Sequence, residues 1–160
     1  MDPEPILLHL SMVAVTLAGF SGVVVALGRR SEGLWQRGEL RRLAELLGLS
    51  LSAALFAVLP GLLGLSGMDA ASSWRMSAAT TLVFWLLQSG SAMLDPERRR
   101  SPLAWVDVLI ALLFGVALAL VAIGVITRGH VFVYTLAIFA MLATAAARFY
   151  WLLMTGVCAD

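Results

Sequence analysis

Polar side chains recur along one face of the apolar stretch that runs from Ser77 to Asp95. Their spacing alternates between four and three residues, which places them on one side of a helix. The residues on this face are Ser77, Thr81, Phe84, Gln88, Ser91 and Asp95. Hydroxyl and amide groups in such a row can line a wet pore, or they can join two dry helices by hydrogen bonds. The sequence supports both interpretations.

A second face of the same kind follows nearer the C-terminus. Its residues, again three and four apart, are Tyr134, Ala137, Met141, Thr144, Arg148, Trp151 and Thr155. A 3.5-residue repeat keeps a seam aligned between helices that cross at the left-handed angle usual in membranes. We therefore expect the two faces to meet each other or to line a common space.

Arg148 is the charged residue most deeply placed in this pattern. A charge inside a membrane is costly unless it is paired or hydrated, so Arg148 should face other helices or an aqueous vestibule. Asp107 is its expected partner, and Glu45 is the second choice. The pair either fixes the register of the helices or marks an ion or substrate path. Because arginine stays protonated, it can attract anions or repel cations but cannot relay protons.

Depth in the membrane groups some of these residues. At about 1.5 Å per residue, Ser21, Gln88 and Arg148 each lie about 10 Å from the inner boundary, so they could form one layer. The residues assigned to a pore wall or polar layer are Ser21, Ser77, Thr81, Gln88, Ser91, Thr144 and Arg148.

The composition is that of a membrane protein. Of the 160 residues, 61% are hydrophobic and 13% are charged, and the mean hydropathy is +0.93. These values lie outside the range of soluble domains. The linkers between the apolar runs are too short to hold a soluble domain. We therefore expect one transmembrane domain over residues 1–160, with the lipid bilayer as its surroundings and no nucleic-acid partner.

Five apolar runs have about the length of ~20 residues that a membrane-spanning helix needs. They cover approximately 6–27, 43–65, 74–94, 105–126 and 131–154. Arginines gather in the loops after the first and third runs, at Arg29, Arg30, Arg37, Arg41, Arg42, Arg98, Arg99 and Arg100. The positive-inside rule makes these loops cytoplasmic. The prediction is an all-α bundle of five spans in the cytoplasmic membrane of a prokaryote, with the N-terminus outside and the C-terminus cytoplasmic.

Small residues mark the faces on which membrane helices pack, because they let backbones approach closely. The residues assigned to such packing faces are Gly19, Gly22, Ala57, Gly61, Ala111, Gly115 and Ala119. The same positions are possible sites of gating or close approach.

Several classes of chemistry find no support in the sequence. The chain has no lysine, which excludes cofactors bound as a Schiff base and a Walker-type phosphate loop. Cys158 is the single cysteine, so no internal disulfide can form. His9 and His130 have no second ligand at metal spacing, and no catalytic motif is present. We expect neither an enzyme nor a bound metal or cofactor.

Three functions remain. The first is a small homo-oligomeric channel or pore, in which a symmetric ring places the Ser77 to Ser91 face around an axis. The second is a non-catalytic accessory or assembly subunit of a larger membrane complex, whose faces contact other membrane subunits. The third is a small dimeric transporter, although the chain lacks a clear inverted repeat. The sequence favours the channel slightly, because Gln88 and Arg148 at a shared depth exceed what packing requires.

Overall fold

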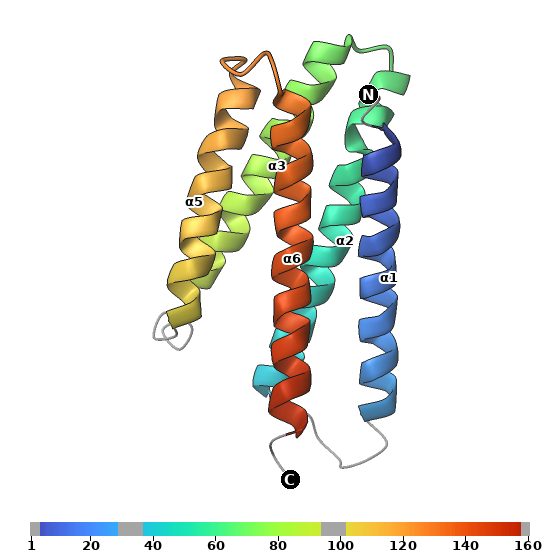
Figure 1. Cartoon of the computed structure of the whole chain (residues 1–160), viewed down its shortest axis with the longest axis vertical. Helices are drawn as coiled ribbons and strands as arrows, with labels where there is room; N and C mark the ends of the chain where they lie inside the picture. The colour runs from blue at the N-terminus through green and yellow to red at the C-terminus, as the bar shows by residue number, and fades with distance from the viewer. Residues whose placement is uncertain (1–3, 29–36, 94–101, 158–160) are drawn as a thin grey trace. The chain divides into compact units, whose positions relative to one another are not determined.

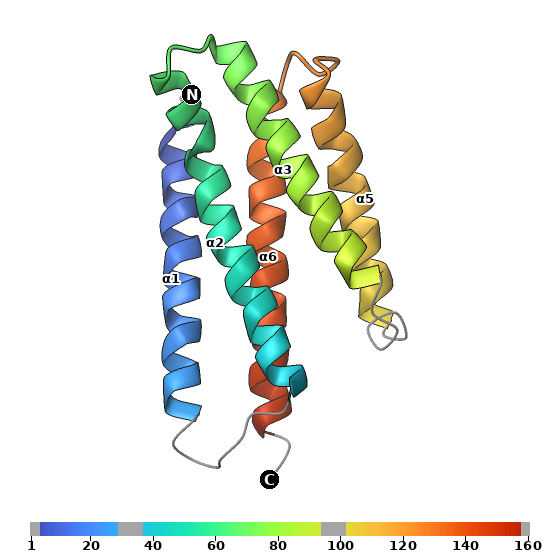
Figure 2. The same cartoon turned by 180° about the vertical axis from the view of Figure 1, so that it is seen from behind.

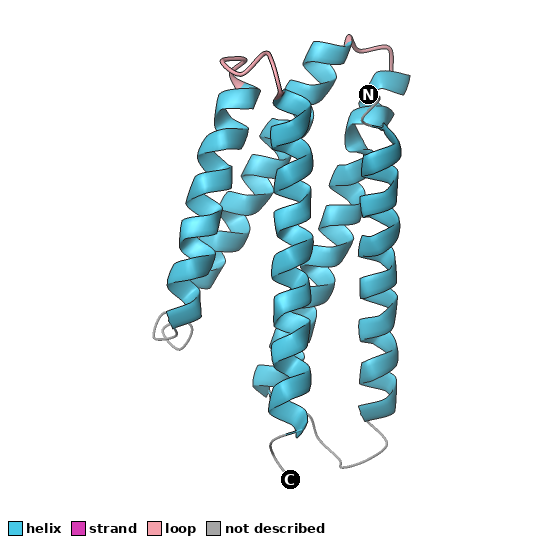
Figure 3. Ribbon diagram, viewed as in Figure 1, coloured by secondary structure: helices cyan, strands magenta, loops and turns pink. Residues whose placement is uncertain are grey.

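The structure, a computed structural model, describes the backbone of residues 4–28, 37–93 and 102–157 and the side chains of 5–23, 43–90 and 108–150. Within these ranges the chain forms five α-helices and no strand (Figures 1 and 3). The helices are α1 (Glu4–Gly28), α2 (Arg37–Leu65), α3 (Ala70–Met93), α5 (Pro102–Ala122) and α6 (His130–Val157). The prediction of an all-α protein is confirmed for the described residues.

Three helices contain segments long and apolar enough to cross a membrane. Among the described residues these segments are Pro5–Val23, Leu43–Leu65 and His130–Tyr150. In α5, whose side chains are described from Val108 onward, the apolar part is Val108–Ala122. α3 has no such segment, since its hydroxyls and Gln88 lower its hydropathy. The three segments are compatible with a membrane location.

The helices divide into two compact units. The first comprises Met1–Val58 and Ile138–Asp160, within the described ranges, and the second comprises Leu59–Ala137. In the first unit, α1 and the end of α6 run in one direction and the start of α2 runs in the other (Figures 1 and 2). Its core includes three alanines and two larger apolar side chains that are all fully buried, namely Ala14, Leu46, Ala53, Met141 and Ala145.

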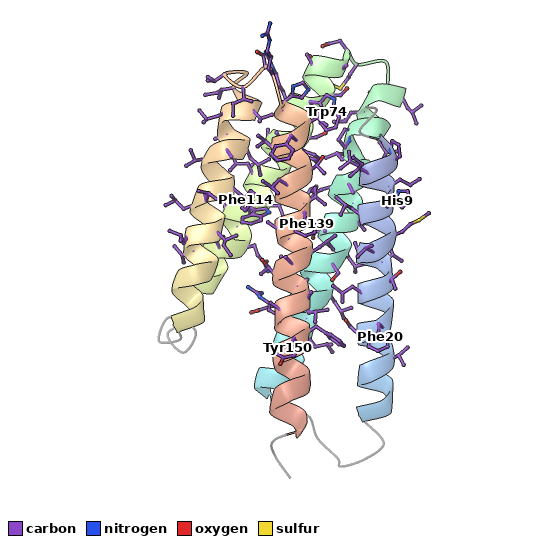
Figure 4. All side chains as sticks on the ribbon, in the orientation of Figure 1. His9, Phe20, Trp74, Phe114, Phe139 and Tyr150 are labelled. Carbon is purple, nitrogen blue, oxygen red and sulfur yellow. The ribbon has the colours of Figure 1, made fainter. Side chains whose placement is uncertain are left out.

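In the second unit, α3 packs along α5 (Figure 2). Gly115 of α5 is buried at this contact, where an added Cβ would lie 3.7 Å from the Leu82 side chain. The rings of Trp85 and Phe114 also meet across it, with centroids 5.9 Å apart; Phe114 is labelled in Figure 4. A small residue opposite a large one therefore sets the spacing of these two helices.

α5 ends in a glycine turn whose N–H groups donate hydrogen bonds to the last carbonyl groups of the helix. The Gly124 N–H donates to Val121 O, and the Val125 N–H donates to Leu120 O, both at 3.0 Å. This pair of bonds is a Schellman motif, which needs a residue in the left-handed region after the helix. Gly124 fills that position with φ of +79°. The turn stops the helix at Ala122, before the predicted end of the span at residue 126.

α3 begins with an N-cap. The carboxylate of Asp69 accepts a hydrogen bond of 3.0 Å from the Ser72 N–H, and the Asp69 carbonyl oxygen accepts another from the Ser73 N–H. An aspartate at this position satisfies amide groups that the helix itself leaves unpaired. The Ser72 side chain and backbone hold the pKa of Asp69 below its ordinary value of 3.8. The cap starts α3 at Ala70, before the predicted start of the span at residue 74.

Candidate functional site

A column of hydroxyl groups runs along the buried face of α3. Ser73, Ser77 and Thr81 are 3%, 0% and 0% exposed. Each donates its proton to the carbonyl oxygen four residues earlier, which belongs to the N-cap residue Asp69 for Ser73 and to α3 for the other two, at 3.1, 2.8 and 2.8 Å. Because a hydroxyl group has one proton, none of the three keeps a donor for a neighbouring helix or a solute. We call these three residues the hydroxyl column.

Tyr134 of α6 meets the hydroxyl column from the facing helix. It is fully buried, and its phenol oxygen lies 3.3 Å from Thr81 Oγ1. Since Thr81 gives its proton to Ser77 O, the phenol donates to Thr81 and not the reverse. The distance is long for an O–H···O bond. The two polar faces found in the sequence therefore touch at Thr81 and Tyr134.

Trp74 covers the outer side of this contact. Its ring packs edge-on against Tyr134, with centroids 5.6 Å apart, and against His130, with centroids 5.7 Å apart (Figure 4). The His130 Nδ1 is 2.9 Å from Thr127 O, so that nitrogen carries the proton and donates. The predicted pore wall or polar layer contains Ser77 and Thr81 but neither Ser73 nor Tyr134, although Tyr134 lies on the second polar face of the sequence.

Further along α3 the face is less enclosed. Gln88 is partly exposed and makes polar contacts of its own. Trp85 is buried, and its indole nitrogen has no hydrogen-bond partner in the part of the chain with described side chains. Ser91 and Asp95, which complete the predicted face, have side chains outside the described residues.

Arg148 in the first unit is held by Glu45. Its Nη1 donates to Glu45 Oε2 at 2.9 Å and so joins α6 to α2. The two side chains are 18% and 20% exposed. A charge-assisted bond between largely buried groups is stronger than an ordinary hydrogen bond. The structure thus pairs Arg148 with the partner that the sequence ranked second, while the side chain of Asp107 lies outside the described residues.

The other members of the predicted layer are bonded to their own helices. Ser21 is fully buried and donates to Leu17 O at 2.7 Å. Thr144 is partly buried and donates to Ala140 O at 2.8 Å. Ser21 and Arg148 belong to the first unit, and Gln88 belongs to the second.

The predicted packing positions fall into two groups. Ala57 and Gly115 are buried, and Ala111 and Ala119 are partly exposed. Gly19, Gly22 and Gly61 are exposed, and a Cβ added at any of them would meet no atom within 4 Å. These three glycines therefore do not lie in helix contacts of the described chain. A small residue permits close approach but does not require it, and so spacing alone did not separate the two groups.

The described side chains offer no ready metal site, since no group of three or more His, Cys, Asp or Glu that could hold an ion is found among them. Comparison of the chain with known protein families, curated proteins and solved structures found no match. The function must therefore be argued from the hydroxyl column and the Arg148 to Glu45 ion pair.

Proposed function

We propose that this chain is a non-catalytic accessory or assembly subunit of a larger membrane complex. The observation that carries the proposal is the hydroxyl column, whose members are buried and have given their protons to their own helix or its N-cap residue. A pore wall must instead offer its polar groups to water or ions. Buried hydroxyl groups that already donate to backbone carbonyl oxygens suit dry contacts between helices.

The same bonds support a chain that crosses the membrane five times. α3 has 24 residues and is about 36 Å long at 1.5 Å per residue, which exceeds the ~30 Å of a hydrocarbon core. Hydroxyl groups that donate within the helix do not need water, so α3 can lie in lipid despite its lower hydropathy. The arginine-rich loops then place the N-terminus outside and the C-terminus in the cytoplasm of a prokaryotic cell.

A homo-oligomeric channel is the second candidate. The Arg148 to Glu45 pair favours it, because both side chains are partly exposed and lie on helices long and apolar enough to span a membrane. Ionisable groups inside membrane segments often line ion or substrate paths. In such a channel the partly exposed Gln88, and not the hydroxyl column, would contribute from α3.

Cysteine accessibility separates wet from dry positions. In a Cys158→Ser background, which removes the single native cysteine, new cysteines replace Ser77, Thr81 or Gln88 one at a time. Ser66→Cys, in an exposed turn, is the positive control. With a charged maleimide we expect rapid labelling at position 66 and none at 77 or 81. Labelling at 77 and 81 as fast as at 66 would refute a dry column.

Reconstitution tests the function directly. As an accessory subunit, the purified chain should give no ion flux in liposomes above that of empty vesicles, and it should leave native membranes in a stoichiometric complex with another protein. Flux in the wild type that Gln88→Leu and Arg148→Leu abolish would instead support the channel and overturn the accessory proposal.

A further inference from the structure

Arg75 lies at the end of the second unit where α3 begins and α5 ends. Its guanidinium rests against the Gly124 turn: a Cβ built on Gly124 would lie 2.5 Å from Nη2 and 2.7 Å from Cζ. The missing side chain of Gly124 therefore makes room for the guanidinium. The negative end of the α5 dipole at this turn also favours a cation there.

The Arg75 guanidinium has hydrogen-bond donors that the described residues leave unused. Although the side chain is exposed, it makes no hydrogen bond or ion pair with any residue that the structure describes. Asp69 is the one acidic residue with a described side chain in this unit, and its carboxylate already caps α3. The result is a positioned, planar cation with five donors, which no carboxylate among the described side chains neutralises.

The neighbouring tryptophan ring indicates where this cation lies in a membrane. Trp74 precedes it and packs against His130 and Tyr134 (Figure 4). Tyr134 is buried within the unit, whereas Trp74 keeps some exposure. Tryptophan rings favour the headgroup region, where phosphate oxygens are the main anions. Guanidinium groups bind phosphate oxygens through two parallel hydrogen bonds, which an ammonium group cannot do.

We propose that Arg75, seated on the Gly124 turn, binds the phosphate of an anionic lipid headgroup. The site rests on the membrane location of the proposed function, but not on whether the chain is an accessory subunit or a channel. Its partner is a lipid and not free phosphate, because the seat lies beside the Trp74 ring, which favours the headgroup layer.

The test measures binding of short-chain phosphatidylglycerol to the purified chain in a non-ionic detergent by native mass spectrometry. Phosphatidylcholine of the same chain length and inorganic phosphate are the comparison ligands. Arg75→Gln should weaken the binding of phosphatidylglycerol about fivefold, the effect typical of one basic residue at an anionic surface. Arg75→Lys, which keeps the charge but loses the planar fork, should recover only part of it.

Two matched controls separate a seated guanidinium from simple charge. Arg128→Gln removes the same charge from an exposed side chain in the turn after α5 and should leave binding unchanged. Gly124→Ala keeps the charge but displaces the flexible guanidinium, so it should weaken binding as Arg75→Gln does. Gly67→Ala places the same strain at a φ of +87° with nothing within 4 Å, and should have no effect.

Four results would overturn the proposal. Arg75→Gln could bind phosphatidylglycerol as the wild type does. Arg128→Gln or Gly67→Ala could weaken binding as much as Arg75→Gln and Gly124→Ala, which would leave only net charge or backbone strain as the cause. Inorganic phosphate could displace the lipid at equal concentration, which would make free phosphate the ligand. Binding of both lipids with the same affinity in the wild type would count against it as well.

Discussion

Removing one side of the Arg148 to Glu45 ion pair should destabilise the chain unequally, depending on which side is removed. Glu45→Leu leaves a guanidinium that stays charged, whereas Arg148→Leu leaves a carboxyl group that can take up a proton in an apolar environment. Both side chains are about four-fifths buried, at 18% and 20% exposure. Glu45→Leu should therefore be the more harmful change.

The magnitude follows from the position of the pair. Exposed ion pairs contribute about 0.2–1 kcal/mol, whereas breaking a fully buried pair costs about 3–5 kcal/mol. An arginine at the centre of a membrane helix costs about 2.5–3.5 kcal/mol on insertion scales. Arg148 lies between the middle and the C-terminal end of α6. We expect Glu45→Leu to lower the free energy of unfolding by about 2 kcal/mol and Arg148→Leu by about 1 kcal/mol.

The double variant should lose less than the sum of the two single losses, because two leucines leave no charge behind. Both side chains also interact with other groups, and a double-mutant cycle is the measurement that isolates the pair. Unfolding in mixed micelles with increasing dodecyl sulfate, followed by circular dichroism, gives the four free energies. Additive losses, or a larger loss for Arg148→Leu than for Glu45→Leu, would refute the reasoning.

Three further changes test the second unit by the same unfolding assay unless stated. Tyr134→Phe should lower the unfolding free energy by only about 0.6 kcal/mol, the mean for hydrogen bonds between membrane helices, because its bond to Thr81 is long at 3.3 Å; a loss above about 2 kcal/mol would contradict this. Gly115→Ala should have little effect on the unfolding free energy. Gly115→Leu should lower it by about 1–3 kcal/mol by overpacking the contact between α3 and α5. A Gly115→Leu variant as stable as the wild type would show that the two helices do not pack there. Asp69→Ala should lower the thermal midpoint at neutral pH. Ser72 lowers the pKa of Asp69, and a lowered native pKa stabilises the fold above the ordinary value of 3.8 and ceases to do so as the pH falls through the native pKa. A midpoint difference that stays constant in acid would argue against the cap.

The helices themselves could be read from the sequence, but their ends could not. Apolar runs of suitable length predicted each of the described helices, because burial in lipid depends on composition. The predicted spans at 74–94 and 105–126 are α3 over Ala70–Met93 and α5 over Pro102–Ala122 in the structure. A cap at Asp69 and a left-handed glycine at Gly124 set these ends. Hydropathy does not register either feature.

The polar sites could be located from spacing but not interpreted from it. Ser77 and Thr81 share one face in both the sequence and the structure, since helical periodicity fixes that relation. Whether the face is wet depends on where each hydroxyl proton goes and on which residue of another helix covers it. Tyr134 provides that cover, and its contact with Thr81 joins residues 53 positions apart. Periodicity within one helix carries no information about such a contact.

Depth in the membrane likewise could not predict which acidic residue pairs with Arg148. Asp107 and Glu45 lie at similar predicted depths, and depth alone cannot say which helix turns its acidic side chain toward α6. The 2.9 Å bond to Glu45 depends on the rotation of α2 about its axis. Rotation is set by tertiary packing, to which Leu46 and Ala53 of the same helix contribute from the core.

The division into two units also implies an order of assembly during synthesis. The second unit is contiguous in sequence over Leu59–Ala137, so all of its segments emerge from the ribosome before the end of α6 is made. The first unit combines the beginning of the chain with Ile138–Asp160, and its ion pair closes a loop of 103 residues. Contacts between distant segments form late, because the loop must exist before it can close. A chain whose synthesis stops before residue 148 therefore contains Glu45 but lacks the Arg148 guanidinium that pairs with it. Such an unfinished chain lacks the positive charge that neutralises this carboxylate in the finished chain.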